Sequence, residues 1–127
     1  MKTLSTLIII LLLSGCSIRS GNDITGTWLM HKVMLNGQEV TADHDPHNER
    51  FIIMRADSTF ETGGRPFGKN TGRYVFNPED HMLFLDSDAG PDDDSQWKVT
   101  IEGDTMHWQG YGSEWAVNFE LIHTRKK

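Results

Sequence analysis

The densest group of side chains able to do chemistry is an acidic segment, residues 86–94. It reads Asp-Ser-Asp-Ala-Gly-Pro-Asp-Asp-Asp and carries five carboxylates in nine residues. Calcium takes about six to eight oxygen ligands, and Asp-x-Asp-x-Gly is how many calcium-binding loops begin. The twelfth position counted from Asp86 is Trp97, not the glutamate that closes such a loop. We therefore prefer a solvated acidic loop without a metal, which could steer a basic protein partner toward residues 86–94.

A second candidate is the pair His44 and His47, two imidazoles three positions apart. Zinc favours such ligands, but Pro46 lies between them and the segment does not read as one helical face. An exposed polar loop is the preferred interpretation. The sequence also lacks a Gly-x-Ser-x-Gly nucleophile elbow and a phosphate-binding glycine loop. We expect no catalytic residues, no cofactor and no enzyme activity.

Cys16 is the one cysteine of the 127 residues. It follows a positive start at Lys2 and an aliphatic run at residues 7–13, which is shorter than the roughly 20 residues of a spanning helix. Such a run is typical of a secretory signal peptide. The stretch Leu13-Ser14-Gly15-Cys16 resembles the lipobox of bacterial lipoproteins. That resemblance implies that residues 1–15 are a signal peptide and that Cys16 carries the lipid.

Lipidation of Cys16 would leave no thiol for a disulfide, a nucleophile or a metal site. Residues 16–23 then form a short polar tether, and acyl chains hold the protein at a membrane of the cell envelope. Ser17, in place of the Asp that favours inner-membrane retention in enteric bacteria, points to the outer membrane. Loss of Lys2 changes the net charge from −6 to −7. A chain this acidic is a poor candidate for binding nucleic acid.

The remaining chain alternates apolar and polar residues in short runs bounded by turn residues, which predicts strands. We expect eight strands at residues 27–35, 50–56, 59–62, 72–77, 81–85, 96–101, 105–109 and 115–123. Loops connect them at residues 40–49, which could contain a helical turn, and at 63–71 and 86–95. Sequential antiparallel pairing favours an all-β, up-and-down barrel of eight strands, because closure leaves no exposed edge. A two-sheet sandwich is the alternative.

The first strand opens with Gly26-Thr27-Trp28, a Gly-x-Trp. Together with the Asn36-Gly37 turn and the Gly72-Arg73-Tyr74 strand, it resembles the compact lipocalin-like domains of bacterial lipoproteins. The resemblance spans about 100 residues and implies a lipocalin-like barrel over residues 24–125. The Thr-Asp-Tyr turn of full-size lipocalins is absent, and Arg125 is a displaced counterpart of their late arginine. We expect Gly26 and Trp28 to close one end of the barrel, with the ring as a plug.

An eight-stranded barrel can be filled by its own side chains or can hold one small ligand. The large side chains expected inside, and hence the candidate ligand contacts, are Tyr74, Phe76, Trp97, Met106, Trp108, Trp115 and Phe119, with Val99 and Val117 beside them. The lipocalin resemblance implies a small apolar or amphipathic ligand, such as a fatty acid, a lysophospholipid or a haem-like compound. The alternative is a filled barrel that binds proteins through its loops, as an inhibitor, immunity factor or assembly accessory. A cavity above about 300 Å³ would favour the ligand.

Overall fold

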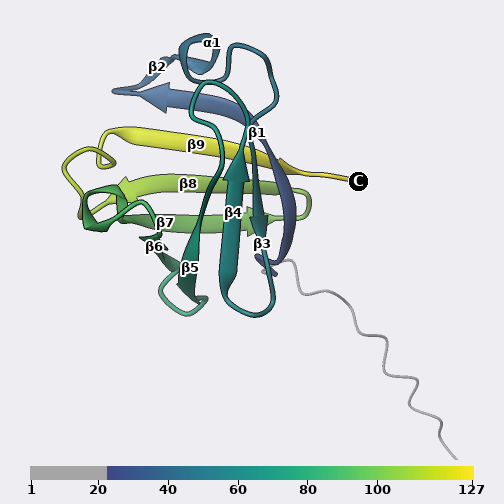
Figure 1. The fold of residues 1–127 in the computed structure, drawn as a ribbon, viewed down its shortest axis with the longest axis vertical. Helices are drawn as coiled ribbons and strands as arrows, with labels where there is room; N and C mark the ends of the chain where they lie inside the picture. Colours follow the sequence, from purple (N-terminus) through teal and green to yellow (C-terminus); the bar gives the residue numbers. More distant parts are fainter. Residues whose placement is uncertain (1–22) are drawn as a thin grey trace, which may run out of the picture.

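The structure is a computed structural model that describes residues 23–127, so Cys16 and most of the expected tether lie outside it. Strands dominate the described part (Figure 1). They are β1 Gly26–Leu35, β2 Gln38–Glu39, β3 Phe51–Met54, β4 Thr59–Gly63, β5 Asn70–Asn77, β6 Met82–Ser87, β7 Ser95–Glu102, β8 Thr105–Tyr111 and β9 Phe119–Arg125. A four-residue helix α1, Thr41–His44, and a 3₁₀ turn η1, Pro91–Asp93, complete the list.

Each strand from β3 to β9 pairs antiparallel with the next, and β9 pairs back onto β1. The ring of β1 and β3 to β9 is a closed barrel of eight strands, which confirms the all-β barrel and excludes the two-sheet sandwich. β2 stands outside this ring as a short hairpin on the end of β1. The helical turn expected within residues 40–49 is α1.

β1 pairs with two neighbouring strands, β3 and β9, over different parts of its length. Its first residues, Gly26 to Leu29, pair with β3, whereas β9 pairs with β1 from Trp28 to its last residue, Leu35. The register to β9 shifts between Met30 and Lys32, a bulge that bends the strand. Beyond the bulge β3 no longer accompanies β1, and β2 and α1 take its place. The barrel wall is therefore irregular at this end, near Arg50, whose carbonyl accepts a hydrogen bond from the Met30 amide.

The opposite end is sealed by Trp28, which is fully buried and donates from Nε1 to the Ile24 carbonyl at 2.9 Å. The Arg125 guanidinium lies over the indole, 4.1 Å from its centroid. Gly26 has φ +127°, and a Cβ there would lie 3.0 Å from Arg125 Nη1. A glycine at this position therefore leaves room for the arginine.

The alternation seen in the sequence produces the core most clearly in β7 and β8. Every second residue of β7 points inward, and Trp97, Val99 and Ile101 are all buried. In the neighbouring strand β8, Met106 and Trp108 also point inward and are buried. This period of two is what a sheet with one buried face requires.

The prediction for the last strand was wrong at its start. β9 begins at Phe119, and residues 113–118 form a turn in which the Val117 amide donates to the Ser113 carbonyl at 3.0 Å. Trp115 and Val117 are consequently 48% and 47% exposed instead of facing a core. The turn packs against β8, because Gly110 has no side chain: a Cβ there would lie 1.7 Å from the Ala116 carbonyl oxygen.

Candidate functional site

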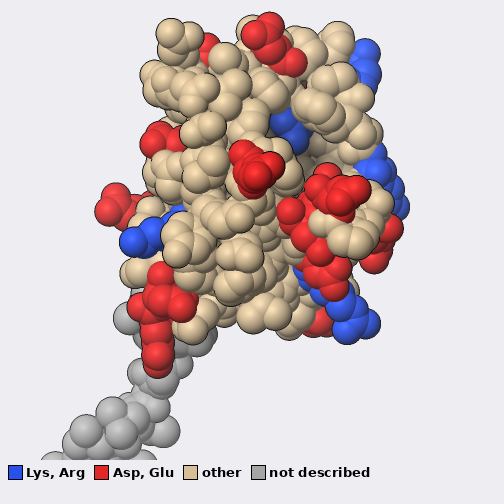
Figure 2. Space-filling view, turned by 90° about the vertical axis from the view of Figure 1, so that its left-hand side faces the viewer, with Lys and Arg blue, Asp and Glu red and all other residues tan. Residues whose placement is uncertain are grey.

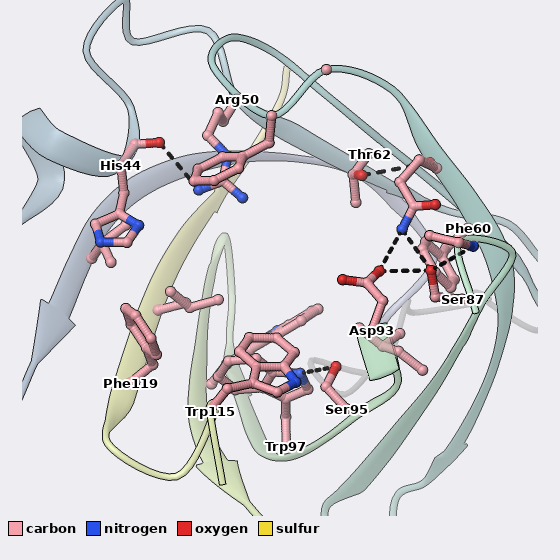
Figure 3. A pocket seen from close by; sticks show the side chains of 18 of the residues that line it. His44, Arg50, Phe60, Thr62, Ser87, Asp93, Ser95, Trp97, Trp115 and Phe119 are labelled. Carbon is pink, nitrogen blue, oxygen red and sulfur yellow. Dashed lines mark hydrogen bonds between the residues drawn. The ribbon is translucent and has the colours of Figure 1, made fainter. Parts of the chain in front are cut away.

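The barrel contains a cavity of about 530 Å³ at the end away from Trp28. Its lining comes from β1, from the strands β4 to β9, from the end of α1 and from the loops between these elements. The aromatic part is formed by Phe60, Phe67, Trp97, Trp108, Trp115 and Phe119 (Figure 3). The volume lies within the range of about 300–1,000 Å³ usual for small-molecule sites.

A cluster of indoles forms one wall of the cavity. The Trp97 ring lies 5.4 Å from that of Trp108 and 6.0 Å from that of Trp115, the latter edge to face. Trp97 Nε1 donates to Ser95 Oγ at 2.8 Å, so the polar atom of this buried ring is satisfied. The wall therefore presents mainly apolar ring surface, suited to a hydrocarbon or another ring.

Across the cavity from the indoles lies Arg50 (Figure 3). Its Nη1 donates to the His44 carbonyl at 3.2 Å, and its guanidinium lies 4.7 Å from the centroid of the Phe67 ring. Burial lowers the pKa of Arg50, and the nearby Asp45 carboxylate opposes that shift. Within residues 23–127, no carboxylate oxygen lies within 4.0 Å of this guanidinium. Arg50 therefore places a cation in the wall that faces the indoles.

A third wall is polar and comes from the acidic segment. Asp93 Oδ2 accepts from Ser87 Oγ at 2.6 Å and from Asn70 Nδ2 at 3.0 Å, and Asn70 also donates to Ser87. Asp94 accepts from the Ser87 amide and Asp88 from the Thr71 hydroxyl. These carboxylates tie the segment to β5 and β6.

Neither metal candidate from the sequence assembles in the part of the chain that the structure describes. No three His, Cys, Asp or Glu side chains there are grouped so that they could hold a metal ion. His44 instead packs its ring 5.3 Å from that of Phe119 and 6.1 Å from that of Phe67. Among residues 23–127 there is also no helix with the length and apolar character needed to cross a bilayer.

The seven ligand candidates from the sequence fall into two groups. Four line the cavity: Trp97, Trp108, Trp115 and Phe119. The other three do not: Tyr74 and Phe76 border a shallow hollow near Ile24, and Met106 is fully buried in the core. Tyr74 donates from its hydroxyl to the Arg55 carbonyl, and burial raises its pKa. Facing inward was not sufficient, because Tyr74, Phe76 and Met106 lie away from this cavity.

Sequence reasoning did not place Arg50, His44 or Phe67 at a ligand cavity. For Arg50 a signal was available. It precedes Ile52 and Met54 at intervals of two, and both are buried, so the alternation of β3 places Arg50 on the inner face. Figure 2 faces the loops drawn on the left of Figure 1 and shows basic atoms recessed in a hollow, with acidic side chains gathered beside it.

The fold resembles that of a DUF4847 family protein. That solved structure, from Bacteroides vulgatus, superimposes with a TM-score of 0.57 over 81% of this chain and 94% of its own, at 12% sequence identity. No family model matches the chain, and no curated protein matches it. At this identity the likeness concerns the barrel alone, and the function has to be argued from the cavity.

Proposed function

We propose that this chain is a lipid-anchored, lipocalin-like protein of the cell envelope whose barrel binds a small amphipathic molecule. The observation that carries the proposal is the cavity of about 530 Å³ at one end of the barrel. A protein-interaction barrel with a filled core would have no use for such a space. Closely packed interiors leave few voids larger than a water molecule.

The lining supports an amphipathic ligand over a purely polar one. The indoles of Trp97 and Trp108 offer apolar surface, whereas Arg50 and the Asn70–Ser87 pair offer charge and hydrogen-bonding groups on the other walls. Small-molecule sites commonly combine a mostly apolar lining with a few fixed polar groups. A molecule with a hydrocarbon body and one polar end matches this division.

The anchor rests on the sequence of residues 1–16. In the described part, the chain enters the barrel at the closed end, since Arg125 Nη2 donates to the Asp23 carbonyl at 3.0 Å and its guanidinium stacks on Trp28. The cavity lies at the other end. A tether on Cys16 would thus join the barrel at the closed end. The end that contains the cavity would remain free to exchange ligand.

Binding can be tested by displacement of an apolar fluorescent dye from residues 17–127, which contain every strand of the barrel. Leu85 and Leu121 both line the cavity, so the double variant Leu85→Trp, Leu121→Trp should fill it and lower dye binding at least tenfold. Val75→Trp is the matched control, because Val75 is 65% exposed on the outer face. Equal dye binding by the filled variant and by the wild type would contradict the proposal.

The anchor is tested separately by metabolic labelling of the full chain with an alkyne fatty acid. Label on the wild type that is lost in Cys16→Ser is the expected result. An unlabelled wild-type chain would exclude lipidation while leaving ligand binding untouched.

A further inference from the structure

The cavity has one cation whose position is fixed. Arg50 is held by its Nη1 bond to the His44 carbonyl and by the Phe67 ring below its guanidinium. Only one of its five N–H donors has a hydrogen-bond partner in the described part of the chain. The others remain available to an oxygen-bearing group in the cavity.

Within residues 23–127 no carboxylate forms a close ion pair with Arg50, although the Asp45 charge acts on it from a greater distance. Asp45 accepts the Glu49 and Arg50 backbone amides through Oδ1, so its carboxylate braces the segment and approaches no closer than 4.0 Å to the guanidinium. Asp93 is engaged by Ser87 and Asn70. Lys69, the other cation of the lining, has its Nζ 3.4 Å from Glu61. Arg50 is thus the cation that lacks a close anionic partner.

Leaving a guanidinium in an apolar wall is costly unless an anion accompanies it. Burial lowers the pKa of Arg50, which is consistent with this cost. A bound carboxylate would form two parallel hydrogen bonds with the fork of the guanidinium. Its hydrocarbon chain could then extend along the Trp97 and Trp108 rings on the facing wall.

We infer that the ligand is a singly charged carboxylate amphipath, of the fatty-acid class, with its headgroup on Arg50. This inference rests on the proposed ligand binding and names the class of ligand. One negative charge balances one guanidinium. A dianionic headgroup would bring a second negative charge into a cavity that Asp93 lines, near an Arg50 on which the Asp45 charge already acts.

The test compares four ligands with the same ten-carbon chain: decanoate, decanol, decyl phosphate and decyltrimethylammonium. Competition with the apolar dye gives the affinity of each for residues 17–127 at neutral pH. We expect decanoate to bind roughly tenfold or more tightly than the other three, since charge-assisted hydrogen bonds are the strong ones. Arg50→Met should bind decanoate and decanol equally, whereas Arg50→Lys should keep part of the preference. Arg73→Met, at an exposed position of β5, should behave as the wild type.

The outcomes separate the two proposals. Two results would contradict a headgroup bound to Arg50 while leaving a ligand-binding barrel. One is binding of decanol as tightly as decanoate, and the other is a preference for decanoate that survives in Arg50→Met. Tightest binding of decyl phosphate would overturn the singly charged headgroup. If none of the four ligands displaces the dye, and the dye itself does not bind, the proposed function fails as well. Should Arg50→Met not fold, the wild-type ranking and Arg50→Lys still decide.

Discussion

Arg125 covers the ring of Trp28 at 4.1 Å, although nearly the whole barrel separates the two residues in the sequence. The same guanidinium donates to the carbonyls of Thr25 at 2.8 Å and Asp23 at 3.0 Å. It thereby joins the last strand to the chain leading into the first. This contact closes the end of the barrel opposite the cavity.

Arg125→Met should destabilise the barrel. The substitution keeps much of the side chain's length but removes two charge-assisted hydrogen bonds to carbonyls and the contact with Trp28, at a cost of about 2–3 kcal/mol. Urea denaturation measures the free energy of unfolding of each variant. Lys127→Met is the control, since Lys127 is 86% exposed and should change stability by less than about 0.5 kcal/mol. Equal stability of both variants would mean that the arginine does not hold the closed end.

Gly110→Ala should displace the turn of residues 113–118. A Cβ at Gly110 would overlap the Ala116 carbonyl oxygen, so the turn must move, and we expect a loss of about 3 kcal/mol. Trp115 should move with it, changing tryptophan emission. Gly103→Ala serves as the comparison: it has φ +58° but open space, and should cost about 1 kcal/mol and leave the emission unchanged. Identical effects of the two variants would speak against the packed turn.

Acid should weaken the barrel through His123. Burial, with a smaller effect of the Arg50 charge, lowers the pKa of His123 from 6.5 to about 3. Because of this difference, His123 binds a proton more readily in the unfolded chain than in the folded one. Neutral His123 therefore stabilises the fold fully above pH 6.5, and this contribution is lost as the pH falls toward 3. The free energy of unfolding should fall by up to about 1.4 kcal/mol per pH unit in that window.

His123→Phe isolates this effect. The Nδ1 of His123 is buried without a hydrogen-bond partner, and the ring packs 4.9 Å from that of Trp108, so a phenyl ring can replace it. Between pH 6.5 and 4.5 the variant should lose markedly less stability than the wild type. Parallel curves for the two proteins would show that His123 does not titrate with unfolding.

Calcium should leave the melting temperature unchanged. Asp88, Asp93 and Asp94 each accept a hydrogen bond from β5 or β6, so they are committed to tying the acidic segment down. Thermal unfolding with excess calcium and with a chelator should give superimposable curves. A melting temperature that rises with calcium would show that residues 86–94 bind the ion.

The sequence was a sufficient guide where short-range alternation decides the structure. β7 and β8 follow directly from the spacing of their apolar residues, and Gly26 with Trp28 marked the start of β1. The start of β9 was missed because the same alternation runs through Trp115 and Val117. The chain turns there because of a steric fit between Gly110 of β8 and the turn of residues 113–118, which lies close in space and does not show in the alternation.

The cavity could not be derived from the sequence. Whether Trp97 and Trp108 fill the barrel or line a space depends on how β1, β3 and α1 part at one end. Tyr74 and Met106 have the same inward pattern but lie where the interior is packed or closed. Arg50 was also missed, although its spacing from the buried Ile52 and Met54 is a signal that could have placed it on the inner face.

The most direct test of a ligand-binding barrel is equilibrium dialysis of residues 17–127 against isotopically labelled decanoate. The cavity predicts saturable binding of one molecule per chain, lost when Leu85 and Leu121 are both replaced by tryptophan. Binding that never saturates, or that is the same in the filled variant, would contradict the account.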